Sequence, residues 1–204
     1  ASMQKASLIF FIDKQLSTRY TNKSMIQFYK ANAKVSGTAC SFSVNPKDKS
    51  VYASLIKQKS WDANSKTGRF DTENKCITKL SVMELGAIIN AIETKSDWSA
   101  YHGTQTRATK MNFSPYSQGD NHGYNFRVTA DSKEDSENKA TFSMGFRYGE
   151  AEALKQYFVF AMHAIFQNSL EEAQANASGN KKSNYGKPAP KQPQQDKVEE
   201  DVVW

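Results

Sequence analysis

Residues 23–61 read KSMIQFYKANAKVSGTACSFSVNPKDKSVYASLIKQKSW and contain three short runs of alternating apolar and polar side chains. These runs are Met25–Lys30, Thr38–Val44 and Val51–Lys59. The segments AKVSG and NPKD, which are rich in turn-forming residues, separate them. A period of two is typical of strands that bury one face, so the stretch predicts an antiparallel meander.

The two faces of this meander differ in chemistry. One face is apolar and includes Ile26, Phe42 and Leu55. The other face carries Gln27, Tyr29, Ser41, Ser43, Tyr52, Ser54 and Gln58. Aromatic rings on a polar face can stack bases, and lysines close by can neutralise phosphates. The stretch therefore suggests nucleic-acid binding, which the rest of the chain must support.

The remaining chain repeats the same arrangement. Residues 75–81 predict a fourth strand, and a helix follows over 81–95, with Ser81 as N-cap and Glu84 at the capping-box position. Four further strands are predicted at 97–103, 109–116, 123–130 and 139–146, and a second helix at 147–173. The fold class is therefore α+β, with two four-stranded antiparallel sheets that are each followed by a helix. The polar residues 61–75 predict a long loop.

Composition divides the chain into a domain with extensions. We expect an N-terminal arm at 1–22 that contains the apolar run Ser7–Ile12, and a folded domain at 23–170. Residues 171–195 contain very few apolar side chains, which predicts a disordered polar linker, and 196–204 form an acidic tail peptide. The formal net charge of the chain is +6, although the tail holds four acids and one lysine. The body is thus basic, as expected of a protein with an anionic partner or simply of a soluble basic protein.

Several classes of protein are disfavoured by the sequence. No apolar run reaches the roughly 18 residues that a membrane helix needs. His102, His122 and His163 are scattered, with His163 expected in a buried helix, and no metal-protease, paired CxxC or phosphate-loop motif occurs. We therefore predict no enzyme, no cofactor and no metal. Cys40 and Cys76 have no metal-like spacing and are expected to be buried free thiols rather than a disulfide.

Candidate binding residues are aromatic or basic and lie on or beside the predicted strands. The candidates for base stacking are Tyr29, Tyr52, Trp61, Phe70, Trp98 and Tyr101. The candidates for phosphate contact are Lys23, Lys30, Lys57, Lys59, Arg69, Lys75, Lys79, Lys110 and Arg127, and Gln27 is a further candidate for nucleic-acid binding. Stacking tolerates any base, so the expected binding is largely independent of sequence and depends on salt.

The chain from Lys23 to Gln167 resembles the Whirly family of single-stranded-DNA-binding proteins. The resemblance rests on SMIQFYK and SFSVNP as first and second strands, on the helix VMELGAIINAIE, on GYNFRVTA, and on TFSMGF followed by EAEALKQYFVFAMHAIF. It implies two sheets packed like propeller blades, a homotetramer built through the helices, and single strands lying along sheet edges. Plant members carry a Lys-Gly-Lys-Ala motif in the first strand, of which only Lys23 has a counterpart here.

The tail peptide is similar to the ends of bacterial and phage single-stranded-DNA-binding proteins, where acids precede a hydrophobic or aromatic residue. The residues that would bind partner enzymes of replication or recombination are Glu199, Glu200, Asp201, Val202, Val203 and Trp204. A solubilising tail is the alternative. The expected location is the cytoplasm of a bacterial or phage-infected cell, or else a mitochondrion or plastid after removal of a transit peptide.

Two alternatives to DNA binding stay open. One is an RNA-binding or RNA-annealing protein of the mitochondrial guide-RNA-binding type, because nothing in the sequence identifies a contact to a 2′-hydroxyl. The other is a scaffold whose sheets and tail bind only proteins. The second predicted helix is apolar around most of its circumference, which predicts an oligomer through this helix in preference to a monomeric core.

Overall fold

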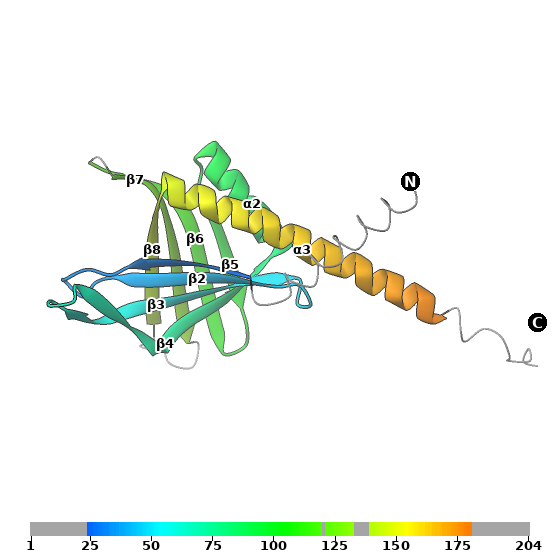
Figure 1. Cartoon of the computed structure of the whole chain (residues 1–204), viewed down its shortest axis with the longest axis horizontal. Coiled ribbons are helices and arrows are strands. Elements are labelled where there is room, and N and C mark those ends of the chain that lie inside the picture. Colours follow the sequence, from blue (N-terminus) through cyan, green and yellow to red (C-terminus); the bar gives the residue numbers. More distant parts are fainter. Residues whose placement is uncertain (1–23, 120, 133–138, 181–204) are drawn as a thin grey trace, which may run out of the picture. The chain divides into compact units, whose positions relative to one another are not determined.

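The computed structural model describes residues 24–119, 121–132 and 139–180, which form eight strands and two helices. The elements are β1 Met25–Lys30, β2 Thr38–Asn45, β3 Ser50–Asp62, β4 Thr67–Ser81, α2 Val82–Thr94, β5 Trp98–Gly103, β6 Arg107–Gln118, β7 Asn121–Ser132, β8 Lys139–Arg147 and α3 Tyr148–Asn180. Strands β1 to β4 form the first sheet and β5 to β8 the second, each an antiparallel meander in chain order (Figure 1). The predicted class and the predicted order of elements are confirmed.

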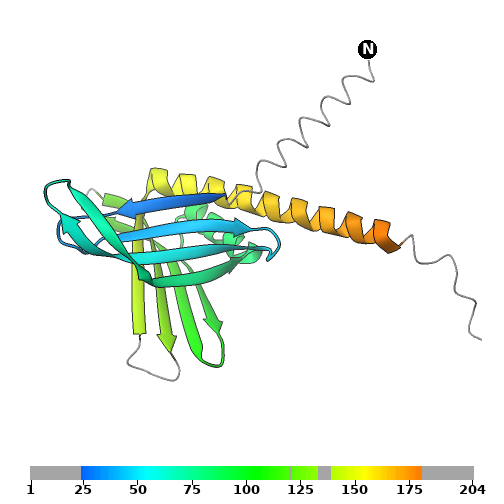
Figure 2. The same cartoon turned by 60° about the horizontal axis from the view of Figure 1, so that its bottom comes forward.

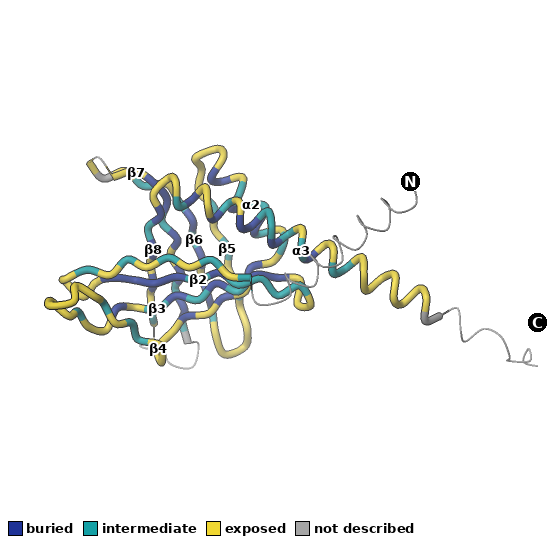
Figure 3. Tube along the Cα trace, viewed as in Figure 1, coloured by how far each residue is buried: buried dark blue, intermediate teal, exposed yellow. Residues whose placement is uncertain are grey.

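The core lies between the two sheets and combines aromatic with aliphatic side chains. Phe42 of the first sheet has its ring centroid 5.9 Å from that of Phe126 in the second, and Phe28 meets Phe146 edge-on at 4.9 Å. Buried residues follow the central strands of both sheets, and exposed residues gather towards the hairpin ends (Figure 3). Cys40 and Cys76 are buried free thiols, as predicted. The apolar phase of each strand therefore faces the other sheet, and the polar phase remains outside.

Helix α2 begins where the capping box predicted. The Ser81 hydroxyl accepts a hydrogen bond from the Glu84 backbone N–H, and the Glu84 carboxylate accepts one from the Ser81 backbone N–H. Its buried residues are Leu85, Ile88, Ala91 and Ile92. The hydroxyl of Tyr124 in β7 donates to the Ile92 carbonyl at 2.7 Å, which fixes the end of α2 to the second sheet.

Helix α3 packs on the core through one stripe of its first half. Ala151, Leu154, Phe158, Ala161 and Ile165 are buried at spacings of three and four residues. The Tyr157 hydroxyl donates to the Ser24 carbonyl at 2.9 Å, which ties the helix to the start of β1. His163 is exposed, so the expectation of a core histidine is wrong, because this residue falls on the face opposite the stripe.

The end of α3 differs from the sequence expectation. The chain divides into compact units between Ser169 and Leu170, and α3 continues beyond this point to Asn180. The linker predicted from residue 171 therefore begins as helix, because its first residues, EEAQANA, include several that favour helices. Residues 170–178 are all exposed. The predicted arm, Lys23 and the tail peptide lie outside the described residues.

The first sheet also contains a longer hairpin than expected. Residues 61–75, predicted as a loop, are mostly strand, because β3 continues to Asp62 and β4 starts at Thr67. Register shifts at Ile56/Gln58 and Gln58/Ser60 interrupt the pairing of β3 with β4. Residues 71–74 of β4 therefore have no residue directly opposite them in β3. The hairpin turns out of the sheet and back across its end (Figure 2). We call residues 57–75 the docked hairpin.

Candidate nucleic-acid interface

The outward face of the first sheet carries the polar phase of the opening stretch. Two adjacent rows across the sheet are Met25–Ser43–Tyr52–Lys79 and Gln27–Ser41–Ser54–Ile77. Met25 and Ile77 are 43% and 44% exposed, so apolar surface is available beside the hydroxyls and lysines. The Tyr52 hydroxyl donates to Asp48 at 2.8 Å, and this hydrogen bond raises the pKa of Tyr52.

Two aromatic rings meet on this face although they belong to distant strands. Tyr29 lies on edge strand β1 and Phe70 on β4, and their ring centroids are 5.9 Å apart at an interplanar angle of 60°. Tyr29 is 60% exposed, and its hydroxyl donates to the Gln27 side-chain oxygen at 2.7 Å. We call this pair the Tyr29–Phe70 platform. It offers aromatic surface of the kind on which unpaired bases stack.

The docked hairpin brings charge close to the platform. Lys59 and Arg69 are exposed, and so are Lys66 and Lys75. The Asp71 carboxylate accepts hydrogen bonds from the side chain and backbone of Asn74, which lower the pKa of Asp71, and Lys59 adds to this effect. Five basic residues against the three acids Asp62, Asp71 and Glu73 leave the docked hairpin with a net charge of +2, so positive charge is in excess beside the platform.

The outward face of the second sheet is more polar. One row reads Ser99–Asn112–Arg127–Ser143 and the next Tyr101–Lys110–Thr129–Thr141. Tyr101 is 57% exposed on edge strand β5, which resembles the position of Tyr29 on β1. Lys110 and Arg127 are also exposed. The face therefore combines one exposed ring with two cations and a set of amides and hydroxyls.

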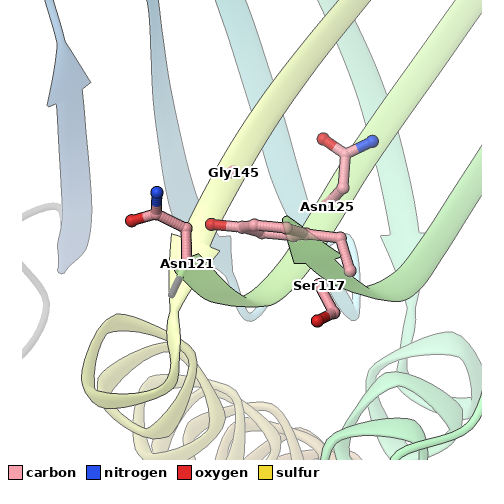
Figure 4. Close-up of a pocket in the computed structure, with 5 residues that line it drawn as sticks. Ser117, Asn121, Asn125 and Gly145 are labelled. Atoms are coloured by element: carbon pink, nitrogen blue, oxygen red, sulfur yellow. The ribbon is translucent and has the colours of Figure 1, made fainter. Parts of the chain in front are cut away.

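An open cavity of about 450 Å³ lies on the same face, near the β6–β7 turn. Its lining consists of Tyr116, Ser117, Asn121, Asn125 and Gly145, and Asn121 and Asn125 lie on opposite sides of this group (Figure 4). Asn125 accepts a hydrogen bond from the Ser143 hydroxyl at 2.6 Å, so its NH₂ group is left to donate. Gly145 lies under the Tyr116 ring, because a β-carbon built there would meet the ring at 3.8 Å.

A second cavity, of about 420 Å³, lies where α2 begins and is lined by Lys79, Ser81, Glu84 and His102. Its His102 Nε2 lies 2.7 Å from the Glu84 carboxylate. Glu84 also completes the capping box of α2, so its contact with His102 joins the start of this helix to β5 of the second sheet. Across the described residues no group of three His, Cys, Asp or Glu side chains could hold a metal ion, and no helix is long and apolar enough to cross a bilayer.

The structure brings most of the predicted binding residues onto these two outward faces or onto the docked hairpin. On the first sheet and its hairpin lie Gln27, Tyr29, Tyr52, Lys59, Trp61, Arg69, Phe70, Lys75 and Lys79. On the second lie Tyr101, Lys110 and Arg127.

Three predicted residues are placed differently. Trp98 points inward and packs against the core, in phase with Ala100. Lys30 pairs with the Glu150 carboxylate at the start of α3. Lys57 reaches the second sheet, where its Nζ lies 5.1 Å from the centroid of the Phe142 ring. These three side chains therefore contribute to packing between elements in the isolated chain.

Tyr116 and Asn125 were not among the sequence candidates, although both belong to the outward phase of their strands. Tyr116 follows Pro115, and Asn125 lies between the buried Tyr124 and Phe126. The alternation in GYNFRVTA therefore indicates that Asn125 faces outward. Gly145, which also lines the cavity, is the cross-strand partner of Asn125.

Comparison with models of protein families gives no match, and comparison with curated protein sequences also gives none. Solved structures do match. WHY1 from Arabidopsis thaliana gives a TM-score of 0.57 at 13% identity, over 82% of this chain and 97% of that one. The plant transcriptional regulator PBF-2 gives 0.54 at 17% identity, over 79% and 97%. The chain has a Whirly-like fold.

The same Whirly-like arrangement extends to a guide-RNA-binding protein complex bound to a guide RNA. That structure gives a TM-score of 0.50 at 12% identity, over 71% of this chain and 93% of that one. The match covers nearly the whole neighbour, so it concerns both sheets and the helices and not one shared hairpin. At these identities it establishes the fold, while the function has to be argued from the residues of this chain.

Proposed function

We propose that the protein binds single-stranded DNA, largely without regard to sequence, and coats unpaired strands during replication or recombination. The observation that carries this proposal is the Tyr29–Phe70 platform, in which the exposed Tyr29 ring meets the half-buried Phe70 ring beside the cations of the docked hairpin. Stacking on such a pair contributes about 1–3 kcal/mol per base and accepts any base. The matching structures, which include a complex bound to a guide RNA, support nucleic acid as the class of partner.

RNA is the second candidate, and the neighbour bound to a guide RNA is the observation that favours it. Fluorescence anisotropy with labelled oligo-dT, oligo-U and duplex DNA, from about 50 mM to about 200 mM salt, separates the candidates. The proposal expects oligo-dT to bind more tightly than duplex, with affinity falling as salt rises. Tighter binding to oligo-U than to oligo-dT would favour an RNA-binding function. Absence of binding to all three at about 50 mM salt would contradict nucleic-acid binding and leave the protein-binding scaffold as the remaining alternative.

We propose further that the chain forms a homo-oligomer, most simply a tetramer, through α3. Phe166 is 57% exposed on this helix, while Val159, Phe160 and Met162 are only half-buried. A second copy could cover these side chains and join the outward faces of neighbouring chains into a longer path for one strand. Light scattering of the full chain tests this, since a monomer at micromolar concentration would remove the shared path.

The acidic residues 196–204 suggest a second role, the recruitment of replication or recombination enzymes in the cytoplasm of a bacterial or phage-infected cell. The acids would steer the peptide to a basic pocket, and Trp204 would fill an apolar slot there. Deleting these residues should leave affinity for oligo-dT equal or higher and abolish capture of such an enzyme. A loss of affinity for oligo-dT would contradict this role.

A further inference from the structure

Gln58 is the one side-chain amide in the described part of the chain that is buried, with 6% of its surface exposed. It lies in the outward phase of β3, where an exposed polar residue is expected. Its Oε1 accepts hydrogen bonds from the backbone N–H groups of Asn32 at 2.9 Å and Gly37 at 3.2 Å. Its Nε2 donates to the carbonyls of Asn32 at 2.9 Å and Ser60 at 3.0 Å. Both donors and both acceptor positions of the amide are therefore used.

These contacts extend the pairing of β2 with β3, which ends at Thr38 and Lys57, into the β1–β2 connection. Asn32 and Gly37 belong to the β1–β2 connection, while Ser60 belongs to the docked hairpin. The backbone adds one more link, because the Gln58 N–H donates to the Gly37 carbonyl at 2.8 Å. A single residue thus fastens the hairpin onto the loop that follows β1.

Two glycines make room for the amide. A β-carbon at Gly37 would lie 2.4 Å from Gln58 Oε1 and 2.2 Å from the Lys30 carbonyl oxygen. A β-carbon at Gly68 would lie 3.0 Å from Gln58 Nε2 and 2.6 Å from the Ala31 side chain. Real β-carbons do not approach other atoms so closely, so the hairpin can dock at this distance only with glycine at both positions.

The docking decides where Phe70 lies. Gln58 stands at the register shifts of β3, and Phe70 is its cross-strand partner. The row Tyr29–Ala39–Ile56–Lys75 places Tyr29 on the far edge of the sheet from β4. Phe70 reaches Tyr29 because the hairpin folds back, while Ala39, the cross-strand partner of Tyr29, is only 3% exposed.

We propose that Gln58 is the positioning residue of the Tyr29–Phe70 platform. By fixing the docked hairpin to the β1–β2 connection, it holds Phe70 beside Tyr29, so that a base stacks on two rings rather than on one. The inference rests on the proposed function. It predicts that loss of the amide removes base stacking on the platform and spares the phosphate contacts made elsewhere.

The test is a double-mutant cycle on the full chain. Gln58→Met keeps the length and volume of the side chain but makes none of the four hydrogen bonds. With labelled oligo-dT, Q58M should weaken binding about as much as Phe70→Ala, roughly 5-fold to 100-fold for the loss of stacking on one ring. In the F70A background, Q58M should cost less than about 2-fold more, because the ring that it positions is gone. In the Tyr101→Ala background, on the other sheet, it should keep its full effect.

Each other outcome overturns the inference. Full additivity of Q58M with F70A would mean that Gln58 acts on binding through something else, and unchanged affinity in Q58M would mean that it does not act at all. The dependence of affinity on salt should be the same in Q58M and the wild type, and a shallower slope would assign the loss to phosphate contacts instead. Should Q58M fail to fold, Gln58→Glu keeps the acceptors for Asn32 and Gly37, and the same cycle is run with it.

A measurement without nucleic acid separates this inference from the proposed function. The backbone amides of Asn32 and Gly37 should exchange hydrogen for deuterium faster in Q58M, while amides of the second sheet keep the wild-type rate. Faster exchange in a protein that binds no oligonucleotide would overturn the proposed function and retain the docking. Unchanged exchange at Asn32 and Gly37 would overturn the inference whatever the protein binds.

Discussion

The two sheets have the same strand order but different outward chemistry. In both, a short edge strand carries an exposed tyrosine, Tyr29 in the first and Tyr101 in the second. In the first sheet the docked hairpin brings Phe70 to that tyrosine, whereas in the second the neighbour across the strand is Lys110. The inward phases build one shared core, so the fold constrains them, while the outward phases remain open to different functions. We infer that the first sheet mainly stacks bases and that the second mainly contacts backbone.

The largest expected effect comes from removing the platform. Tyr29→Ala combined with Phe70→Ala should weaken binding to oligo-dT by about 2–3 kcal/mol, a loss of some 30-fold to 150-fold, because both rings of one stacking surface are removed. Tyr101→Ala should cost less than about 1 kcal/mol, since its ring has no aromatic partner among the residues that the structure describes. Anisotropy titrations at one fixed salt concentration measure both. Equal losses from the two sheets would erase the proposed difference between them.

Replacing one glycine of each sheet by alanine should also have unequal effects on stability. Gly37→Ala places a methyl group against the Lys30 carbonyl and the Gln58 amide, so we expect it to lower the free energy of unfolding by about 1–3 kcal/mol. Gly145→Ala in the second sheet meets the Tyr116 ring at ordinary contact distance and should change stability by less than about 0.5 kcal/mol. Urea denaturation of both variants provides the comparison. A neutral Gly37→Ala would mean that the hairpin is not tightly docked.

Backbone contact by the second sheet should appear as salt dependence. Lys110→Ala combined with Arg127→Ala removes two exposed cations from that face. The slope of log affinity against log salt should become shallower by about 0.7 for each phosphate that is no longer neutralised, and the weakening of binding at low salt should shrink as salt rises. Lys34→Ala, in the β1–β2 connection, is a matched control that should leave the slope within error. An unchanged slope in the double variant would exclude this face from the path of the strand.

The sequence predicted the fold well because apolar alternation is a local signal. Every strand that faces the core shows it, and the Ser81–Glu84 capping box marks the start of α2. The docked hairpin escaped prediction because its residues are polar and its shape depends on Gln58, Gly37 and Gly68, which meet only after folding. Local rules assign such a segment to a loop.

The sequence allows individual residues of the candidate site to be selected, but not all of their contacts. Aromatic and basic residues of the outward phase, such as Tyr29 and Lys110, could be selected by counting along each strand. Trp98 could have been excluded in the same way, since it shares its phase with Ala100. The pairing of Tyr29 with Phe70 could not be predicted, because it depends on two register shifts that no periodicity encodes.

The smallest expected effect concerns an ion pair that links the two halves of the molecule. Lys30, at the end of β1 in the first sheet, pairs with Glu150 in the helix that follows the second sheet. Partial burial alone would raise the pKa of Glu150, but the hydrogen bonds from Lys30 and from the Arg147 backbone N–H outweigh it and lower that pKa below its ordinary value. A carboxylate with a lowered pKa stabilises the fold above the ordinary pKa, and this stabilisation is lost as pH falls through the folded-state pKa.

Glu150→Gln should therefore lower the free energy of unfolding by less than about 1 kcal/mol at neutral pH, because both partners are about one-third exposed to solvent. The difference between variant and wild type should vanish as pH falls through the lowered pKa of Glu150, because the wild-type carboxyl is then also protonated. Urea denaturation at several pH values measures it. A difference that persists at acid pH would come from packing of the side chain rather than from its charge. In that case the ion pair would not contribute to joining the first sheet to the helix of the second.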